Sequence, residues 1–182
     1  MIISIVGPPH AGKKTLGHAL ATALGFAVVE FGSISLAVSE GASSSARRAS
    51  ALVESGRLVP GDLLGRLIRE CVADRDAVVV GYPRTDEEMR GMEVEGGAPN
   101  HHLVHMDATR ELLDARRALL GLPPMERSHP GAFARLAVAL APVVAKADAR
   151  GRMLRLDPSR PTDELLSAVV SFLRGLGALP ES

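Results

Sequence analysis

The sequence predicts an α/β fold, with a five-stranded parallel sheet and helices on both faces of that sheet. Five short apolar runs alternate with helical patterns along the chain, which is typical of parallel sheets. One of these runs, AVVV at 77–80, has the continuous apolar character of a strand covered on both faces. A glycine-rich turn, GPPHAGKKT at 7–15, joins the first strand to the first helix. We expect one domain over residues 1–182, because no linker is long enough to separate two.

The individual elements follow from hydrophobic periodicity and from the residues that end each pattern. The expected strands are 2–6, 26–30, 77–80, 102–106 and 152–156. The expected helices are 13–24, 33–39, 46–55, 61–74, 109–120, 131–147 and 162–173. Residues 41–45 are interpreted as a flexible connection, and a polar, glycine-rich span precedes the fourth strand. Ligands of such sheets bind beyond the carboxyl ends of the strands, where 7–15, 81–85 and 107–110 should gather.

Composition and charge argue against several classes of protein. The 21 basic and 21 acidic residues cancel, so we expect neither a general nucleic-acid binder nor a membrane-surface binder. Cys71 is the one cysteine, which excludes an intramolecular disulfide and a multi-cysteine zinc site. No signal peptide precedes the motif, and no apolar run reaches about 18 residues, the length that suggests a membrane span. We expect a cytoplasmic protein, with a monomer as the default.

The stretch GPPHAGKKT has the G-x-x-x-x-G-K spacing of a phosphate-binding loop. Gly7 and Gly12 allow the backbone to turn its N–H groups around an anion, and the helix that follows adds its partial positive charge. Lys13 would reach the β and γ phosphates, and Thr15 would lie near a magnesium ion. The strict pattern has Ser or Thr directly after the lysine, whereas this chain has Lys14 there, so the loop is a variant.

Four further stretches extend the pattern over nearly the whole chain. They are SGRLVPGDLLGRLIRE at 55–70, GYPRT at 81–85, LVHMDATRELLDARR at 103–117 and LAPVVAKADARGRMLRLD at 140–157. With the loop, they resemble the motifs of adenylate kinases and related nucleoside monophosphate kinases, in which GxPGxGKGT, G-x-L-V-P and GFPRT occur in this order. The resemblance implies a P-loop kinase fold, with acceptor-side helices at about 31–60 and a short lid at about 121–130.

The resemblance also implies a reaction and the residues that carry it. Mg·ATP would phosphorylate a nucleoside monophosphate, AMP as the first guess, with Mg²⁺ held through ATP near Thr15. The implied catalytic residues are Lys13, Arg84, Arg127 and Arg135. The implied ATP-binding residues are Gly7, Pro8, Pro9, His10, Ala11, Gly12, Lys13, Lys14, Thr15 and Arg116, with Arg117 as the alternative to Arg116. The implied acceptor-binding residues are Phe31, Gly32, Val59, Gly81 and Arg84.

The chain departs from the family pattern at the acceptor and magnesium positions. Phe31, Ser33 and Leu36 stand where the pattern has Thr, Asp and Arg, so one cation on the acceptor phosphate is missing. Val80 replaces the acidic residue that orients magnesium waters, and Asp86 and Asp107 are the nearest carboxylates in sequence. The lid is short and lacks the second arginine of its pair.

Three functions remain open at this point. The first is an active nucleoside monophosphate kinase, and the second is a nucleotide-binding protein without phosphoryl transfer that acts as a sensor or partner-binding module. The third is a P-loop kinase with another small acceptor, which would need an Asp or Glu near Arg84 as a base if a hydroxyl is phosphorylated. His101, His102 and His105 are expected to be strand histidines rather than metal ligands, because no matching Asp, Glu or Cys accompanies them.

Overall fold

The computed structural model describes residues 1–93 and 100–180, and its centre is a parallel sheet of five strands. The strands are β1 (Ile2–Val6), β2 (Ala27–Val29), β3 (Ala77–Val80), β4 (His101–Met106) and β5 (Met153–Leu156). Their order is β2-β3-β1-β4-β5, and every neighbouring pair is parallel. The predicted α/β class and the five-stranded parallel sheet are confirmed.

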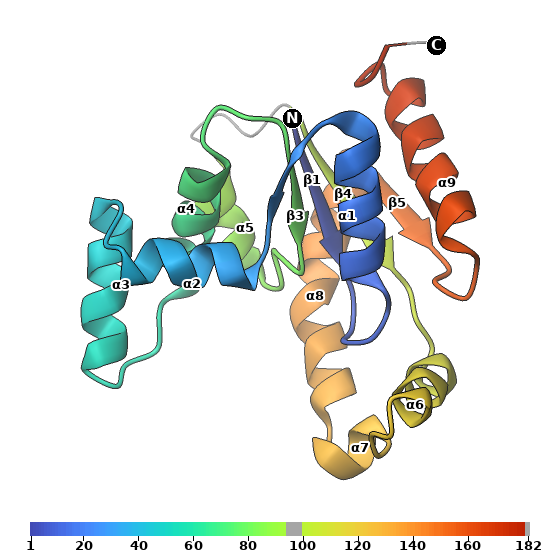
Figure 1. The fold of residues 1–182 in the computed structure, drawn as a ribbon, viewed down its shortest axis with the longest axis horizontal. Helices are drawn as coiled ribbons and strands as arrows, with labels where there is room; N and C mark the ends of the chain where they lie inside the picture. The colour runs from blue at the N-terminus through green and yellow to red at the C-terminus, as the bar shows by residue number, and fades with distance from the viewer. Residues whose placement is uncertain (94–99, 181–182) are drawn as a thin grey trace.

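Helices cover both faces of this sheet (Figure 1). They are α1 (Lys13–Leu24), α2 (Phe31–Ser39), α3 (Ser44–Glu54), α4 (Gly61–Val72), α5 (Asp86–Met92), α6 (Arg110–Leu119), α7 (Met125–Ser128), α8 (Ala132–Ala149) and α9 (Thr162–Gly175). Helices α1 and α9 pack on one face, while α4, α5 and α8 pack on the other. Helices α2 and α3 extend from the β2 side, and α6 and α7 lie beyond the carboxyl end of β4.

Side chains of β1 point alternately to the two faces of the sheet, so the protein has a hydrophobic core on each face. Ile3 and Ile5 are fully buried against α1 and α9, whereas Val6 packs with α8 on the opposite face. Each such side chain contributes about 1.5–3 kcal/mol when it is fully buried. The position between these residues is polar but buried: Ser4 Oγ lies 2.8 Å from Nε2 of His101 on the neighbouring strand. Burial lowers the pKa of His101 to about 4, so this imidazole is a neutral part of the core.

Two helices were missing from the sequence prediction, α5 and α7. The polar span after GYPRT begins with α5, whose N-cap is Thr85: its hydroxyl accepts a hydrogen bond from the backbone N of Glu88 at 3.2 Å. The pattern Thr-x-x-Glu at 85–88 is a known helix-start signal that could have predicted it. Residues 94–99 of the span lie outside the described residues.

Helix α3 also begins earlier than expected, at Ser44 within the stretch interpreted as a connection. Ser43 caps it, because its hydroxyl accepts from the backbone N of Ala46 at 3.0 Å.

Among the described residues, no helix combines the length and the hydropathy needed to cross a bilayer.

Candidate functional site

The loop at 7–15 connects β1 to α1 and needs its two glycines for different reasons. Gly7 has φ +138°, and a Cβ there would lie 2.6 Å from the carbonyl oxygen of Met106. Gly12 has φ +94° and caps the N-terminus of α1. Other residues rarely adopt these backbone conformations, so both glycines are required for the turn.

Lys13 lies in the first turn of α1, against the loop. Its Nζ donates to the carbonyl oxygen of Pro8 at 2.6 Å, and burial lowers its pKa to about 8. A Cβ on Gly81 would lie 3.9 Å from Lys13 Cε, which places the GYPRT turn beside the lysine. The loop and the turn that were predicted to gather at the carboxyl end of the sheet do so.

A cavity of about 620 Å³, here named the loop cavity, opens at the start of α1. Its volume is in the range of small-molecule sites. The predicted site residues that line it are His10, Ala11, Gly12, Lys13, Lys14, Thr15, Gly81 and Arg116. The structure thus brings together most of the residues assigned to ATP by resemblance, while Pro8 lies under Lys13 as its hydrogen-bond acceptor.

The two arginines of α6 have different roles. Arg116 lines the loop cavity and donates to the backbone carbonyls of His10, at 3.2 Å, and Pro158. Arg117 is 6% exposed; Nη1 lies 3.0 Å from Nε2 of His10, and its other nitrogens donate to the Pro123 carbonyl and to Ser128 Oγ. Arginine has no acceptor, so His10 Nε2 accepts this hydrogen bond. Arg117 therefore ties the loop to the segment expected as the lid.

The environment of His10 is consistent with a neutral ring. Burial, followed by the charges of Arg117 and Lys13, lowers the pKa of this imidazole. His10 also has φ +64°, in the left-handed region that non-glycine residues seldom adopt. Instead of pointing freely at a phosphate, its side chain joins the loop to α6.

Sequence reasoning missed two charged residues of the loop cavity, Glu30 and Arg160. Glu30 follows β2, and its Oε1 lies 3.0 Å from Nζ of Lys14. Arg160 follows β5, and its guanidinium pairs with Glu164 on α9. Glu30 comes directly after β2, and Arg160 lies four residues beyond the end of β5. The rule that ligands bind beyond the carboxyl ends of strands is the signal that could have found them.

Magnesium prefers oxygen ligands and usually takes one or two carboxylates together with substrate phosphates. Within residues 1–93 and 100–180, no group of three or more His, Cys, Asp or Glu side chains could hold a metal by itself. The loop cavity nevertheless contains one carboxylate, from Glu30, and two hydroxyls, from Thr15 at the start of α1 and Thr162 at the start of α9. This donor set fits a magnesium ion that arrives with a nucleotide. Neither Asp86 nor Asp107, the carboxylates considered from the sequence, is among the residues lining this cavity.

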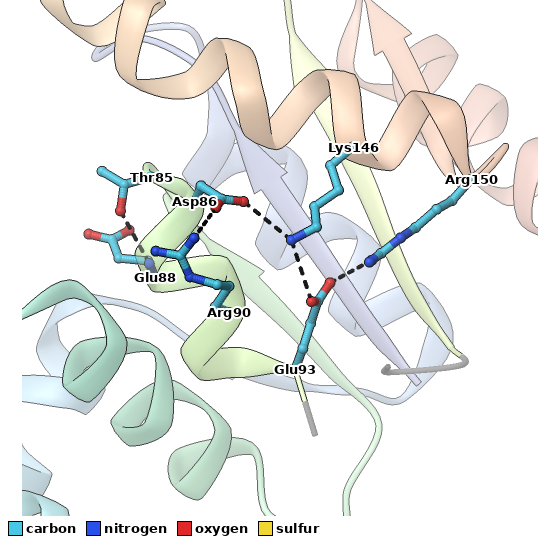
Figure 2. Close-up of polar contacts among 7 residues, drawn as sticks. All are labelled: Thr85, Asp86, Glu88, Arg90, Glu93, Lys146 and Arg150. Atoms are coloured by element: carbon cyan, nitrogen blue, oxygen red, sulfur yellow. Dashed lines mark hydrogen bonds and ion pairs between the residues drawn. The ribbon is translucent and has the colours of Figure 1, made fainter. Parts of the chain in front are cut away.

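Asp86 belongs instead to an ionic network between α5 and α8 (Figure 2). Lys146 Nζ lies 3.3 Å from Asp86 and 3.7 Å from Glu93, while Arg90 pairs with Asp86 at 2.6 Å and Arg150 with Glu93. The network fixes α8 to the helix that follows the GYPRT turn. It also holds Asp86 away from the residues that line the loop cavity, so Asp86 does not replace the acidic side chain missing at Val80.

On the acceptor side, Arg84 follows β3 and lies over the ring of Tyr82, with 4.5 Å between the guanidinium carbon and the ring centroid. Its Nη2 donates to Oε1 of Glu88 at 3.1 Å. Phe31 and Gly32 begin α2, and Val59 is partly buried before α4. Leu36, in place of the family arginine, is 57% exposed. The acceptor side therefore has one arginine whose charge is already paired.

Arg127 and Arg135, expected as lid arginines, are exposed on α7 and α8. Neither is among the residues that line the loop cavity. Arg135 folds back over its own helix start, because a Cβ on Gly131 would lie 2.9 Å from its Nη1. Their role in closing over phosphates stays a prediction.

A second cavity, of about 430 Å³, lies between α8 and the β4–β5 edge and meets the loop at Pro8. Small side chains of α8, Ala137, Ala141 and Ala145, leave this space unfilled. Two of the charged residues that line it, Asp107 and Arg155, pair with each other at 2.9 Å.

Comparison with known proteins agrees with the geometry of the loop. The AAA domain family matches residues 6–120, more than half of the chain. The adenylate kinase of Stenotrophomonas maltophilia is 28% identical over 96% of this chain and 100% of its own length. That of Leifsonia xyli is 27% identical over 97% of this chain and 94% of its own. That of Symbiobacterium thermophilum is 32% identical over 64% of this chain and 57% of its own.

These matches, the parallel sheet and the glycine loop agree on a P-loop nucleotide-binding, kinase-like protein. The identity is low, and the chain departs from the kinase motifs at Leu36 and Val80. The chain belongs to the AAA domain family and is a divergent relative of the adenylate kinases.

Proposed function

We propose that this protein is an adenylate kinase-like phosphotransferase, which moves the γ-phosphoryl group of Mg·ATP to a nucleoside monophosphate, with AMP as the first candidate. The observation that carries the proposal is the loop cavity, where Lys13, Thr15 and Arg116 surround the N-terminus of α1. A helix N-terminus, a glycine loop and two cations are suited to a triphosphate.

The chemistry requires positioning more than proton transfer, because the attacking oxygen of a monophosphate is already anionic. Lys13 would neutralise charge on the transferring group, and Arg84 would hold the acceptor phosphate with its fork of N–H groups. Thr15 and Glu30 are the residues that would hold magnesium, which supplies further charge neutralisation at the β and γ phosphates.

A nucleotide-binding protein without phosphoryl transfer is the second candidate. Leu36 leaves the acceptor side without its second arginine, and Val80 supplies no carboxylate at the end of β3. Transfer of a phosphoryl group depends on several charges acting together, whereas binding of ATP needs only the loop side.

A kinase with a hydroxyl acceptor is favoured by one observation, the carboxylate of Glu88 beside Arg84. Such an acceptor needs a base to remove its proton, and a carboxylate near Arg84 could supply one.

One experiment separates the candidates. Purified protein is incubated with Mg·ATP and each of AMP, CMP, UMP, GMP and dTMP, and diphosphate formation is measured beside Lys13→Ala. Formation of a diphosphate that disappears in Lys13→Ala supports the kinase and names its acceptor. Binding of ATP without any diphosphate favours the second candidate, or an acceptor of another class. Full activity in Lys13→Ala would contradict the assignment of the site.

A further inference from the structure

The second cavity, of about 430 Å³, is separate from the nucleotide site. Among the described residues, none that lines it also lines the loop cavity. Its walls come from α8 on one side and from β4, β5 and the residues after β4 on the other, and Pro8 is its contact with the phosphate loop. We name it the edge cavity, because β5 is an edge strand of the sheet. Its volume is within the range of small-molecule sites.

One face of α8 forms the long wall of the edge cavity, and this wall is apolar. Its larger side chains recur at helical spacing and are Phe133, Leu136, Leu140 and Val144. Exposed alanines lie between them, one turn apart, at Ala137, Ala141 and Ala145. The helix rises about 22 Å from Phe133 to Asp148, at about 1.5 Å per residue. The wall therefore suits a ligand with an elongated apolar body.

The polar side chains of the edge cavity have a net negative charge. Asp107 and Arg155 lie 2.9 Å apart and neutralise each other. Burial is the main cause that lowers the pKa of His105, so this imidazole is neutral at pH 7. Asp148 is the remaining charged residue of the lining. Two carboxylates thus stand against one guanidinium.

The carboxylate of Asp148 has no ionic partner among the described residues. The basic residues nearest to it in sequence, Lys146 and Arg150, both pair with Glu93 after α5 (Figure 2). They are two residues from Asp148 in either direction, which is about 200° around a helix. Asp148 therefore faces the edge cavity while its basic neighbours face α5. The cavity has an unpaired anion at one end of an apolar wall.

These charges favour a cationic ligand over an anionic one. An anion is attracted more strongly to the loop cavity, where Lys13 and Arg116 lie beside a helix N-terminus. In the edge cavity, Arg155 is already paired and Asp148 repels negative charge. The two cavities are therefore complementary to ligands of opposite charge.

We propose that the edge cavity is a second ligand site, which binds a small molecule with an elongated apolar body and a positively charged amine at one end. The apolar body packs along α8 beside its alanines, and the ammonium group lies next to Asp148. The proposal does not depend on the proposed function, because this site shares no lining residue with the nucleotide cavity among the residues that the structure describes.

Alkylammonium ions from butylammonium to octylammonium are the probes, and octanoate is the probe of opposite charge. Binding is followed by NMR titration of the purified protein. We expect affinity to increase about two- to fourfold for each added CH₂ group, because each leaves water for an apolar wall. Octylammonium should bind at least fivefold more tightly than octanoate, since Asp148 attracts one and repels the other.

Two substitutions test the two parts of the site. Asp148→Asn should weaken octylammonium binding about fivefold and leave the affinity for octanoate equal or higher. Asp74→Asn, an exposed carboxylate after α4, is its matched control. Ala141→Leu fills the middle of the cavity and should abolish binding of both probes. Ala134→Leu, exposed on α8 and outside the lining, is the control for the added side chain.

Three results would overturn the proposal. They are equal affinity for octylammonium and octanoate, no binding of octylammonium to the wild-type protein, and octylammonium binding that Ala141→Leu leaves unchanged. Saturating Mg·ATP is added to locate the probe: octylammonium should stay bound, whereas its displacement would place it in the loop cavity and contradict the proposal. The unfolding midpoint of every variant is measured in parallel, so that loss of folding is recognised.

Discussion

The loop side and the acceptor side of the site hold their arginines in different ways. On the loop side, Arg116 and Arg117 donate to backbone carbonyls, a hydroxyl and the imidazole of His10, none of which bears a negative charge. On the acceptor side, Arg84 is held by the carboxylate of Glu88. Neutral acceptors orient a guanidinium without cancelling its charge, whereas a carboxylate does both.

This difference indicates where the site keeps its positive potential. The loop side has Lys13, Arg116 and Arg117 beside a helix N-terminus, which suits a highly charged triphosphate. The acceptor side has a paired arginine and an exposed leucine at position 36. We therefore expect tight binding of ATP and weak binding of a monophosphate, and the following predictions test this contrast from the largest effect to the smallest.

Lys13→Ala should remove most of the ATP affinity. The variant loses a buried cation at the phosphate loop, and we expect a loss of about a hundredfold, or roughly 3 kcal/mol, with no turnover. Calorimetric titration with Mg·ATP gives the affinity. Lys14→Ala is the comparison, because Lys14 is exposed and its charge is paired with Glu30. A larger loss in Lys14→Ala than in Lys13→Ala would show that the loop is used differently.

Gly65→Ala should damage the acceptor side through packing. The added Cβ would lie 2.1 Å from the carbonyl oxygen of Glu88, so α4 and α5 must separate. We expect about 3 kcal/mol of lost stability in denaturant unfolding, and a larger decrease in AMP affinity than in ATP affinity. Gly175→Ala, in helix α9 with nothing within 4 Å of the new methyl group, should leave stability equal or slightly higher. Equal stability of both variants would contradict the close contact of the helices.

The sequence predicted the loop side better than the acceptor side, for a physical reason. The loop at 7–15 is continuous in sequence. Its two glycines indicate a turn with positive φ angles, which both of them adopt. Strands and long helices were also predictable, because periodicity records which face is buried. Arg116, assigned to ATP by resemblance, lines the loop cavity, but no feature of the sequence favours it over Arg117.

The residues that were missed depend on contacts between distant segments. Glu30 lies at the loop cavity because β2 ends near α1. A single Glu after a strand does not indicate which residue it will contact, here Lys14. Glu88 was hidden because α5 is short and begins in a polar stretch, although Thr85 and Glu88 form a recognisable helix start. The sequence suggested a lid from Arg127 and Arg135, whose exposed positions depend on the bend between α7 and α8.

Leu36→Arg should increase the affinity of the acceptor side for AMP. The position is 57% exposed on α2, so the longer side chain has room. If the acceptor phosphate binds near α2, as the resemblance implies, a new charge-assisted contact of about 1.5 kcal/mol would tighten AMP binding roughly tenfold. Val53→Arg on α3, at 58% exposure, adds the same charge away from the site and is the matched control. An equal increase in AMP affinity in both variants would show that the added net charge causes it, and not a contact made by position 36.

The pH dependence of ATP binding should report the charge of Lys13. Burial lowers its pKa to about 8, so the ammonium is mostly charged at pH 7 and mostly neutral at pH 9. ATP selects the charged form, so its affinity should fall as pH rises, about fivefold between pH 8 and pH 9 for a single proton. His10 does not contribute in this range, because its pKa is lowered from 6.5 and it stays neutral. Lys13→Arg keeps its charge at all these pH values and should bind ATP with a flat profile, even if more weakly. A wild-type profile as flat as that of Lys13→Arg would mean that Lys13 keeps its charge despite burial, and the contrast between the two sides would then be larger than its lowered pKa implies.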